Sequence, residues 1–382
     1  MTISRRKFFA GLSASVALPS LIGSASAQGA TMKIGMCSPV TGPAAESGKY
    51  AQIGARLALD AVNKSGGVLG KQVELIVEDD QTTNPGIVLA YSKLASQSDI
   101  VAFLGSIRST QVHAMAPDVL KVGKPVMIGG TDPALTHMGN PWLFRFRPKD
   151  SYSGSVIAEY GVKTLGKNKW AIVHSTDAFG TAGGKALTSA LAKIDGARVA
   201  LDQGYANQSQ DFTPVVLAIK QSGADILGSY FTFENDLGVF ARQLRQLGVT
   251  IPYVGSPSIV NVTALKLAGP ALHGTFGVAD YAEDSSEASK AFGKLYRDVA
   301  KVAPDNQSSW TYDAITILCM AIKKAGKTDP AAIRESILSI RKHAGAEGEY
   351  NFDANGDGLH GYNIVRNENG SIVFDKHIES TS

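Results

Sequence analysis

The chain has 382 residues, of which 44% are hydrophobic and 19% are charged, with 37 basic and 34 acidic side chains. Three of the basic residues, Arg5, Arg6 and Lys7, precede every acidic one, and the chain after residue 27 carries 34 charges of each sign. This balance argues against nucleic-acid binding, because phosphate recognition requires clustered positive charge. The roughly 355 residues that follow are more than one hydrophobic core usually serves, so we expect two lobes.

The first 27 residues have the pattern of an export signal. A mostly apolar stretch over residues 8–23 follows the basic start, and small residues at Ala25 and Ala27 suit a signal peptidase. We therefore predict cleavage after Ala27. Residues 4–9 (SRRKFF) also resemble a twin-arginine signal, although ordinary secretory signals can contain paired arginines too. No later segment approaches the length of a transmembrane helix.

Short apolar runs then alternate with amphipathic segments along the chain. The first series predicts strands at 32–37, 73–77, 101–104 and 126–128, with helices at 51–63, 85–94 and 111–120. The second predicts strands at 171–174, 198–206 and 226–229, with helices at 155–165, 183–194, 212–221 and 237–247. Continuous apolar strands separated by helices indicate parallel sheets covered on both faces. The predicted fold class is therefore α/β, with doubly wound parallel sheets.

This alternation breaks at three places, near residues 132–150, 274–286 and 345–361, before a final strand predicted at 371–374. Three crossovers between two α/β lobes make a hinged pair with a cleft between them. We predict that lobe 1 comprises residues 31–149 and 278–350, and lobe 2 residues 150–277 and 351–382. Ligands of open parallel sheets bind beyond the carboxyl ends of the strands, which can face one another across such a cleft.

Several negative observations limit the chemistry. No Cys/His cluster has metal-ligand spacing, and we expect no metal and no cofactor. For Cys37 and Cys319 we favour two buried free thiols over a disulfide.

Residues 353–358 imitate the start of a calcium loop, but the twelfth position of that loop is Ile364, so we predict a turn. A Gly-x-Ser-x-Gly motif is absent and the histidines are scattered, so we expect no enzyme, with a hydrolase as the weaker alternative.

Six ordered motifs resemble a known family: residues 39–43 (PVTGP), 63–71 (NKSGGVLGK), 77–80 (VEDD), 129–136 (GGTDPALT), 174–180 (HSTDAFG) and 352–357 (FDANGD). Their order and spacing are similar to those of the leucine/isoleucine/valine-binding family of periplasmic substrate-binding proteins, over essentially all of residues 31–378. The resemblance implies a type I fold with a three-segment hinge. It also implies a periplasmic, non-enzymatic, monomeric receptor that closes on a small solute and delivers it to an ABC permease in the inner membrane.

In this family, two turns of the first lobe hold the ligand carboxylate. The resemblance places them here at Ser106–Thr110 and at Gly129, Gly130 and Thr131, with Ser106, Ser109 and Thr131 as candidate contacts. Hydroxyl and backbone N–H groups at a helix start can solvate an anion, although Ser109 and Thr110 could simply cap the helix. Arg108 replaces the family's usual small or polar residue. It could pair with a carboxylate, point to solvent or bridge the lobes.

In the second lobe the family uses aromatic side chains, and Phe179 and Phe233 match those positions. Tyr152 is a further candidate wall. Trp310 and Tyr312 could also contribute, although their alternative role is packing within a lobe.

The position that would pair with a ligand ammonium aligns with Pro257, which cannot do so, and Glu234 or Asp150 would have to replace it. A buried unpaired ammonium costs several kcal/mol. The expected ligand is therefore a branched-chain amino acid or, alternatively, an aromatic or aliphatic acid. A sensor subunit with the same fold is a further alternative.

Overall fold

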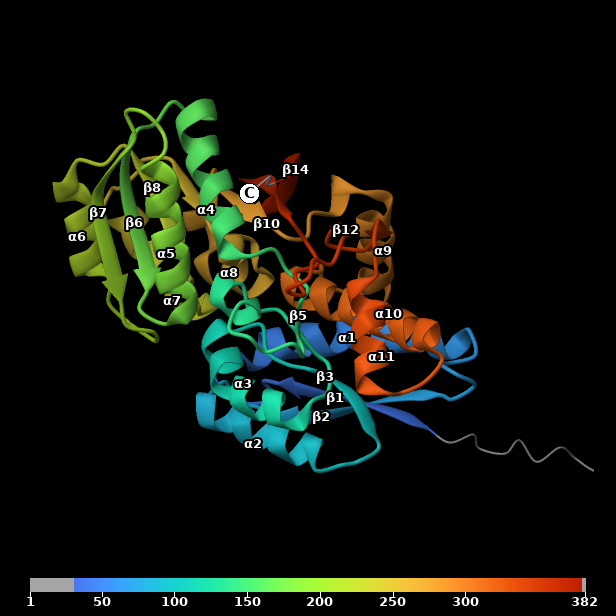
Figure 1. Cartoon of the computed structure of the whole chain (residues 1–382). Helices are drawn as coiled ribbons and strands as arrows, with labels where there is room; N and C mark the ends of the chain where they lie inside the picture. The colour runs from blue at the N-terminus through green and yellow to red at the C-terminus, as the bar shows by residue number, and fades with distance from the viewer. Residues whose placement is uncertain (1–30, 380–382) are drawn as a thin grey trace, which may run out of the picture.

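The computed structural model describes residues 31–379 and contains two main sheets, each flanked by helices (Figure 1). The first sheet and its helices form lobe 1. Its parallel strands, in spatial order, are β2 (Val73–Asp79), β1 (Met32–Ser38), β3 (Ile100–Leu104), β4 (Val126–Ile128) and β5 (Leu143–Arg145). Its helices are α1 (Ala45–Lys64), α2 (Asn84–Ala95), α3 (Ser109–Val122), α9 (Glu287–Ala300), α10 (Asn306–Ala325) and α11 (Pro330–Leu338). The predicted export signal lies outside the described residues.

The second sheet and its helices form lobe 2. Its strands, in spatial order, are β14 (Ser371–Glu379), β13 (Gly361–Glu368), β10 (Phe276–Ala279), β9 (Tyr253–Gly255), β8 (Ile226–Tyr230), β6 (Lys169–Ser175) and β7 (Arg198–Tyr205). Its helices are α4 (Asp150–Glu159), α5 (Ala178–Leu191), α6 (Thr213–Ser222), α7 (Glu234–Gln246) and α8 (Val262–Ala268). A short hairpin of β11 (His343–Ala344) and β12 (Glu349–Tyr350) lies on the third crossover.

Each sheet has a hydrophobic core on both faces, as the continuous apolar strands predict. In β1, Ile34 packs into one core of lobe 1, whereas Cys37 packs into the core on the opposite face. In β6, Val173 and Ile172 divide in the same way between the two cores of lobe 2. Successive side chains of a strand point to opposite faces, so a strand that is buried on both must be apolar at every position. The α/β fold class with two doubly wound lobes is confirmed.

One feature of lobe 2 differs from the expectation of purely parallel sheets. Strand β13 pairs antiparallel with both β10 and β14, so one edge of the second sheet is antiparallel. The sequence analysis did not identify β13, because Asn363, Arg366 and Asn367 interrupt its apolar pattern. Strand β10 also spans position 278, at which we placed a boundary between lobes, and it pairs with β9 and β13 of the second sheet.

The two cysteines and the turn at residues 353–357 agree with the sequence-based expectations. Cys37 and Cys319 are both buried free thiols, as favoured. Residues 353–357 form the expected turn, in which Asp353 Oδ1 accepts hydrogen bonds from the amides of Asn355 and Asp357. Within residues 31–379 no helix is both long and apolar enough to cross a membrane.

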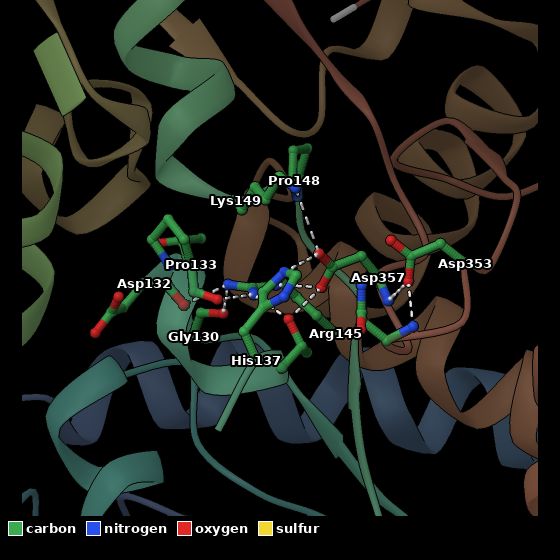
Figure 2. A network of polar contacts seen from close by, with 12 residues as sticks. Gly130, Asp132, Pro133, His137, Arg145, Pro148, Lys149, Asp353 and Asp357 are labelled. Atoms are coloured by element: carbon green, nitrogen blue, oxygen red, sulfur yellow. Dashed lines mark hydrogen bonds and ion pairs between the residues drawn. The ribbon is translucent and has the colours of Figure 1, made fainter. Parts of the chain in front are cut away.

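The first and third crossovers are tied together by a buried polar network around Arg145 (Figure 2). The Arg145 side chain has no exposed surface, and its Nε donates to Asp357 Oδ1 at 2.8 Å. Its terminal nitrogens donate to the carbonyl of Asp132 at 2.7 Å and to Thr136 Oγ1 at 2.6 Å. Burial alone would raise the pKa of Asp357, but the Arg145 charge and hydrogen bonds hold that pKa below its usual 3.8.

A second set of contacts joins all three crossovers. Arg147 Nε donates to Asp280 Oδ2 at 2.5 Å, which links the first crossover to the second. Tyr362 donates to the carbonyl of Pro148 at 2.7 Å, and Asn363 donates to the carbonyl of Asp280 at 2.7 Å. The hinge is therefore a set of three segments held in register by buried hydrogen bonds.

Removing one partner of the buried Arg145–Asp357 pair tests this description. We expect Asp357→Ala to lower the free energy of unfolding by about 3–5 kcal/mol, because the Arg145 charge would be left buried and unpaired. Lys294→Ala, which breaks the exposed Lys294–Asp298 pair on α9, should leave the free energy of unfolding nearly unchanged. Urea denaturation measures both changes, and a loss below about 1 kcal/mol in Asp357→Ala would contradict the expected contribution of the pair.

Candidate ligand-binding site

A cavity of about 50 Å³ lies where the carboxyl ends of the strands of both lobes face each other. Its walls come from segments that follow β3, β5, β6, β8 and β9, together with the start of α10. From lobe 1 and the first crossover, the lining residues are Ile107, Arg108, Arg147, Asn306 and Gln307. From lobe 2 they are Phe179, Phe231, Thr232, Glu234, Ser258 and Asn261. The position agrees with the rule that ligands of open parallel sheets bind beyond the strand carboxyl ends.

Five helices begin at this cavity. Lining residues lie at the first residues or the caps of α3, α5, α7, α8 and α10. Local sequence sets some of these starts: Asp177 Oδ1 accepts from the Gly180 amide to begin α5, and Asp305 caps α10 through the Gln307 amide. The N-terminal end of a helix carries partial positive charge and favours an anion.

Arg108 is the residue by which this turn departs from the family pattern, and its side chain is 8% exposed. One terminal nitrogen lies 3.9 Å from Glu234 Oε2 of lobe 2, and the guanidinium carbon lies 5.4 Å from the centre of the Phe233 ring. Its Nε is buried and has no hydrogen-bond partner in the part of the chain that the structure describes. Arg108 therefore points away from solvent, borders the cavity and bridges the lobes.

Glu234 is the acidic side chain among the lining residues. Its Oε1 accepts a hydrogen bond of 2.8 Å from Ser47 in lobe 1, 187 positions earlier in the chain. Pro257 is buried in the neighbouring turn and does not line the cavity, whereas Ser258 does. Of the two acids expected to replace Pro257 as an ammonium partner, Glu234 is the one that borders the cavity.

The predicted hydroxyl turns lie together in lobe 1, but their polar groups bond within the protein. Ser106 Oγ donates to Gln111 Oε1 at 2.5 Å, and Ser109 Oγ accepts from the amides of Thr131 and Asp132 at 3.2 and 3.1 Å. Thr131 Oγ1 donates to Asp150 Oδ2 at 3.0 Å. None of these residues is among the lining residues, and as ligand contacts they stay predictions.

The remaining predicted residues occupy four kinds of position. Gly129 and Gly130 accept hydrogen bonds from Arg147 and Arg145 through their carbonyls. Phe179 lines the cavity and packs edge-on against Tyr230, and Phe233 lies beneath the Arg108 guanidinium.

The other aromatic candidates lie away from the cavity. Tyr152 is buried at the hinge, where Lys149 Nζ lies 4.7 Å from its ring centre. Trp310 and Tyr312 pack against the cores of lobe 1, as in the alternative reading.

Several lining residues were not identified from the sequence. Arg147 lies between Phe146 and Pro148, in a segment that we treated only as a lobe boundary. Asn261 stands at the start of α8, which was not predicted, and Asn306 begins α10, a late helix expected around Cys319 but without a predicted start. Asparagine followed by an amphipathic segment is a capping signal and could have located the start of α8. In residues 31–379 there is no group of three or more His, Cys, Asp or Glu side chains that could hold a metal.

Asp150 gives a test of the electrostatics beside the site. It has no exposed surface, and burial raises its pKa from 3.8 to about 7 despite the Thr131 hydrogen bond. Between those pH values the folded state binds more protons than the unfolded state, so this carboxyl lowers stability as the pH rises. We expect the stability of Asp150→Asn relative to wild type to grow by a few kcal/mol from about pH 4 to pH 7 and then level off. Denaturation of both proteins across this range measures the difference, and a pH-independent difference would contradict the shifted pKa.

Comparison with known proteins agrees with this architecture. A model of the family described as periplasmic binding protein matches residues 31–371. The Leu/Ile/Val-binding protein homolog 3 of Brucella melitensis is 28% identical over 368 residues, which cover 95% of this chain and 98% of that protein.

Solved structures show the same fold. The leucine-binding protein LivK of Thermotoga maritima superimposes with a TM-score of 0.85 at 23% identity, over 91% of this chain and 99% of that one. A solute-binding protein of R. palustris, solved in complex with benzoate, gives a TM-score of 0.82 at 20% identity, over 92% and 98% of the two chains. With the family model spanning most of its length, this chain belongs to the periplasmic binding protein family.

Proposed function

We propose that this chain is the solute receptor of an ABC importer and that it captures a small carboxylate by closing its two lobes. The observation that carries the proposal is the convergence of five helix starts, Arg108 and Arg147 on one cavity between the lobes. Aligned helix dipoles and guanidinium groups both stabilise a negative charge, and a carboxylate presents the planar geometry that arginine recognises. The site has the features of a holding site rather than a catalytic one.

Contacts between the lobes support hinge closure as the mode of capture. Ser47 donates to Glu234, the Ala178 amide donates to Thr110 Oγ1 at 3.2 Å, and the Val262 amide donates to Asp305 Oδ2 at 3.1 Å. Each of these bonds joins lobe 1 to lobe 2 at the rim of the cavity. A ligand that binds between the lobes favours the closed form by its differential affinity for that form.

Two ligand classes fit the proposal. A branched-chain amino acid would place its ammonium near Glu234 and its carboxylate near the arginines, in keeping with relatives named for leucine, isoleucine and valine. An aromatic or aliphatic acid would instead use Phe179 and Phe231 as its walls, and the benzoate complex of a structural neighbour motivates this alternative. The cavity contains groups for both.

The remaining parts of the proposal concern location and partners. The first 27 residues would direct export, by the twin-arginine route, to the periplasm, with cleavage after Ala27. There the monomeric receptor would deliver its solute to an inner-membrane ABC permease. If the chain serves a sensor instead, deletion of its gene would leave uptake of the solute intact and abolish the response to it.

A thermal-shift screen tests the ligand class directly. We expect wild-type protein without the export signal to be stabilised by at least one of leucine, isoleucine, benzoate or 4-methylpentanoate. A ligand at a hundred times its Kd stabilises the native state by about 2.7 kcal/mol, which corresponds to a few degrees in Tm. Stabilisation by none of a wider panel of carboxylates would contradict the proposed function, as would turnover of a bound compound.

Ser47→Ala tests the contribution of closure to affinity. The hydrogen bond from Ser47 to the Glu234 carboxylate joins the two lobes, so its loss should weaken binding of the best screen compound by about tenfold, without changing its identity. Ser155→Ala removes a comparable hydroxyl whose bond to the Ser151 carbonyl stays within α4. Calorimetric Kd values for both variants separate the effects, and equal affinity in the two would argue against Ser47 as a closure contact.

A further inference from the structure

We propose that the ligand carboxylate is held jointly by the guanidinium groups of Arg108 and Arg147, instead of by the hydroxyl turns at Ser106–Thr110 and Thr131. This inference rests on the proposed function and deepens it, because it states which chemical group of the solute is selected and by which residues. It follows that the receptor distinguishes a carboxylate from the corresponding carboxamide, whatever the remainder of the ligand is.

The hydroxyl turns have few hydrogen-bond donors left for an anion. The hydroxyls of Ser106 and Thr131 donate to Gln111 and Asp150. The amides of Thr131 and Asp132 donate to Ser109 Oγ, and the Arg108 amide donates to Ser106 Oγ at 2.9 Å. Since an anion needs donors rather than acceptors, the Ser106 and Thr131 hydroxyls would have to break existing bonds in order to bind it.

Arg108 has donors that the protein does not use. Its Nε is buried without a partner among residues 31–379, and its contact with Glu234 at 3.9 Å is longer than a hydrogen bond. A buried guanidinium whose donors make no hydrogen bond is costly even with the Glu234 charge nearby, so Arg108 favours an anion that enters the cavity and accepts from those donors. The side chain is held by the Phe233 ring beneath it, which orients the guanidinium without competing for its donors.

Arg147 approaches the same cavity from the first crossover and is anchored on its other side. Its Nε donates to Asp280 Oδ2 and its Nη1 donates to the Gly129 carbonyl at 3.1 Å. In the described part of the chain, no acceptor is recorded for its Nη2, and the residue lines the cavity. The Asp280 contact therefore positions the guanidinium and leaves one edge for a ligand oxygen.

The acidic side chains next to Arg147 determine how strongly its guanidinium attracts a ligand anion. Asp280 and Glu347 both lie close to its guanidinium, within a buried group that also contains Asp313 and the hydroxyl of Tyr350. Burial raises the pKa of Asp280 and raises the pKa of Glu347 well above its usual value, while each acid opposes ionisation of the other. When one of the two acids is protonated, the other balances the Arg147 charge without an excess of negative charge, so this group does not repel a ligand anion.

The test compares carboxylates with their carboxamides in matched variants. The probes are benzoate with benzamide, 4-methylpentanoate with 4-methylpentanamide, and leucine with leucinamide, measured by calorimetry. For any carboxylate that binds wild type, we expect the carboxamide to bind about tenfold to a hundredfold more weakly. Arg108→Gln should lose a similar factor for the carboxylate, whereas Arg198→Gln, at an exposed position on β7, should leave its Kd unchanged.

For Arg147 the comparison separates ligand contact from hinge support. Asp280→Asn removes the negative charge that pairs with Arg147 but keeps a side-chain oxygen that can accept from its Nε, so the guanidinium stays positioned and carboxylate affinity should not fall. Adding Arg147→Gln to that background should weaken binding by about tenfold to a hundredfold. If Arg147 only supported the hinge, Asp280→Asn alone would weaken binding as much as the double variant, and that result would overturn the inference. Should the double variant not fold, Asp280→Asn with Arg147→Lys, which keeps the charge but not the planar fork, should show the same direction of change.

Failure of this inference and failure of the proposed function give different results. Carboxylate binding that survives both arginine changes but is lost in Thr131→Val would overturn the arginine clamp and leave the solute-receptor function standing. The absence of binding by every carboxylate to wild-type protein would contradict both.

Discussion

The buried guanidinium groups of Arg145 and Arg147 hold together the crossovers on which the geometry of the site depends. Arg145 fills the space between the first and third crossovers, where every hydrogen-bonded partner is a buried carboxylate, hydroxyl or backbone carbonyl. Arg147 joins the first crossover to the second through Asp280. Since these segments connect the two lobes, both side chains help to fix how the lining residues of one lobe lie relative to those of the other.

The same region contains carboxyl groups whose ionised form is destabilised by burial. Burial raises the pKa of Asp305 to about 6 and that of Asp313 to about 6, close to the cavity and the hinge. Each carboxylate accepts hydrogen bonds from backbone amides, which partly offset the cost of burial. Buried acids at the rim of the cavity disfavour an anionic ligand, so such a ligand can bind only next to guanidinium groups. Arg108 and Arg147 provide these groups. The polar hinge and the proposed anion site therefore belong to the same buried group of charges.

Much of the fold could be predicted from the sequence because it depends on local periodicity. The apolar runs around Ile34 and Ile172 pack into cores on both faces of their sheets, as continuous hydrophobic strands require. The antiparallel edge at β13 could not be predicted in this way. Its buried face, which includes Tyr362 and Ile364, alternates with polar residues whose partners lie on other segments, such as Asn363 with the Asp280 carbonyl.

The candidate site divides along similar lines. Phe179 lies in a motif that the resemblance indicated, Glu234 was a candidate as an acid near Pro257, and both line the cavity. Arg147 was not predicted, because its orientation is set by Asp280, which lies 133 positions later in the chain. For Ser109 and Thr131 the motif located the turn correctly, but whether a hydroxyl is available to a ligand depends on its neighbours in space.

The sequence by itself determined the two-lobed α/β architecture, the family and the turns that border the cleft, since these follow from periodicity and from the order of short motifs along one chain. Only the tertiary structure decided which polar groups in those turns remain free. Ser47 and Glu234, or Arg108 and Glu234, meet through the closure of two lobes over more than a hundred intervening residues. A donor that is hydrogen-bonded to an acceptor from the other lobe is not available to a ligand. Local sequence does not reveal such an acceptor, because only folding brings it close.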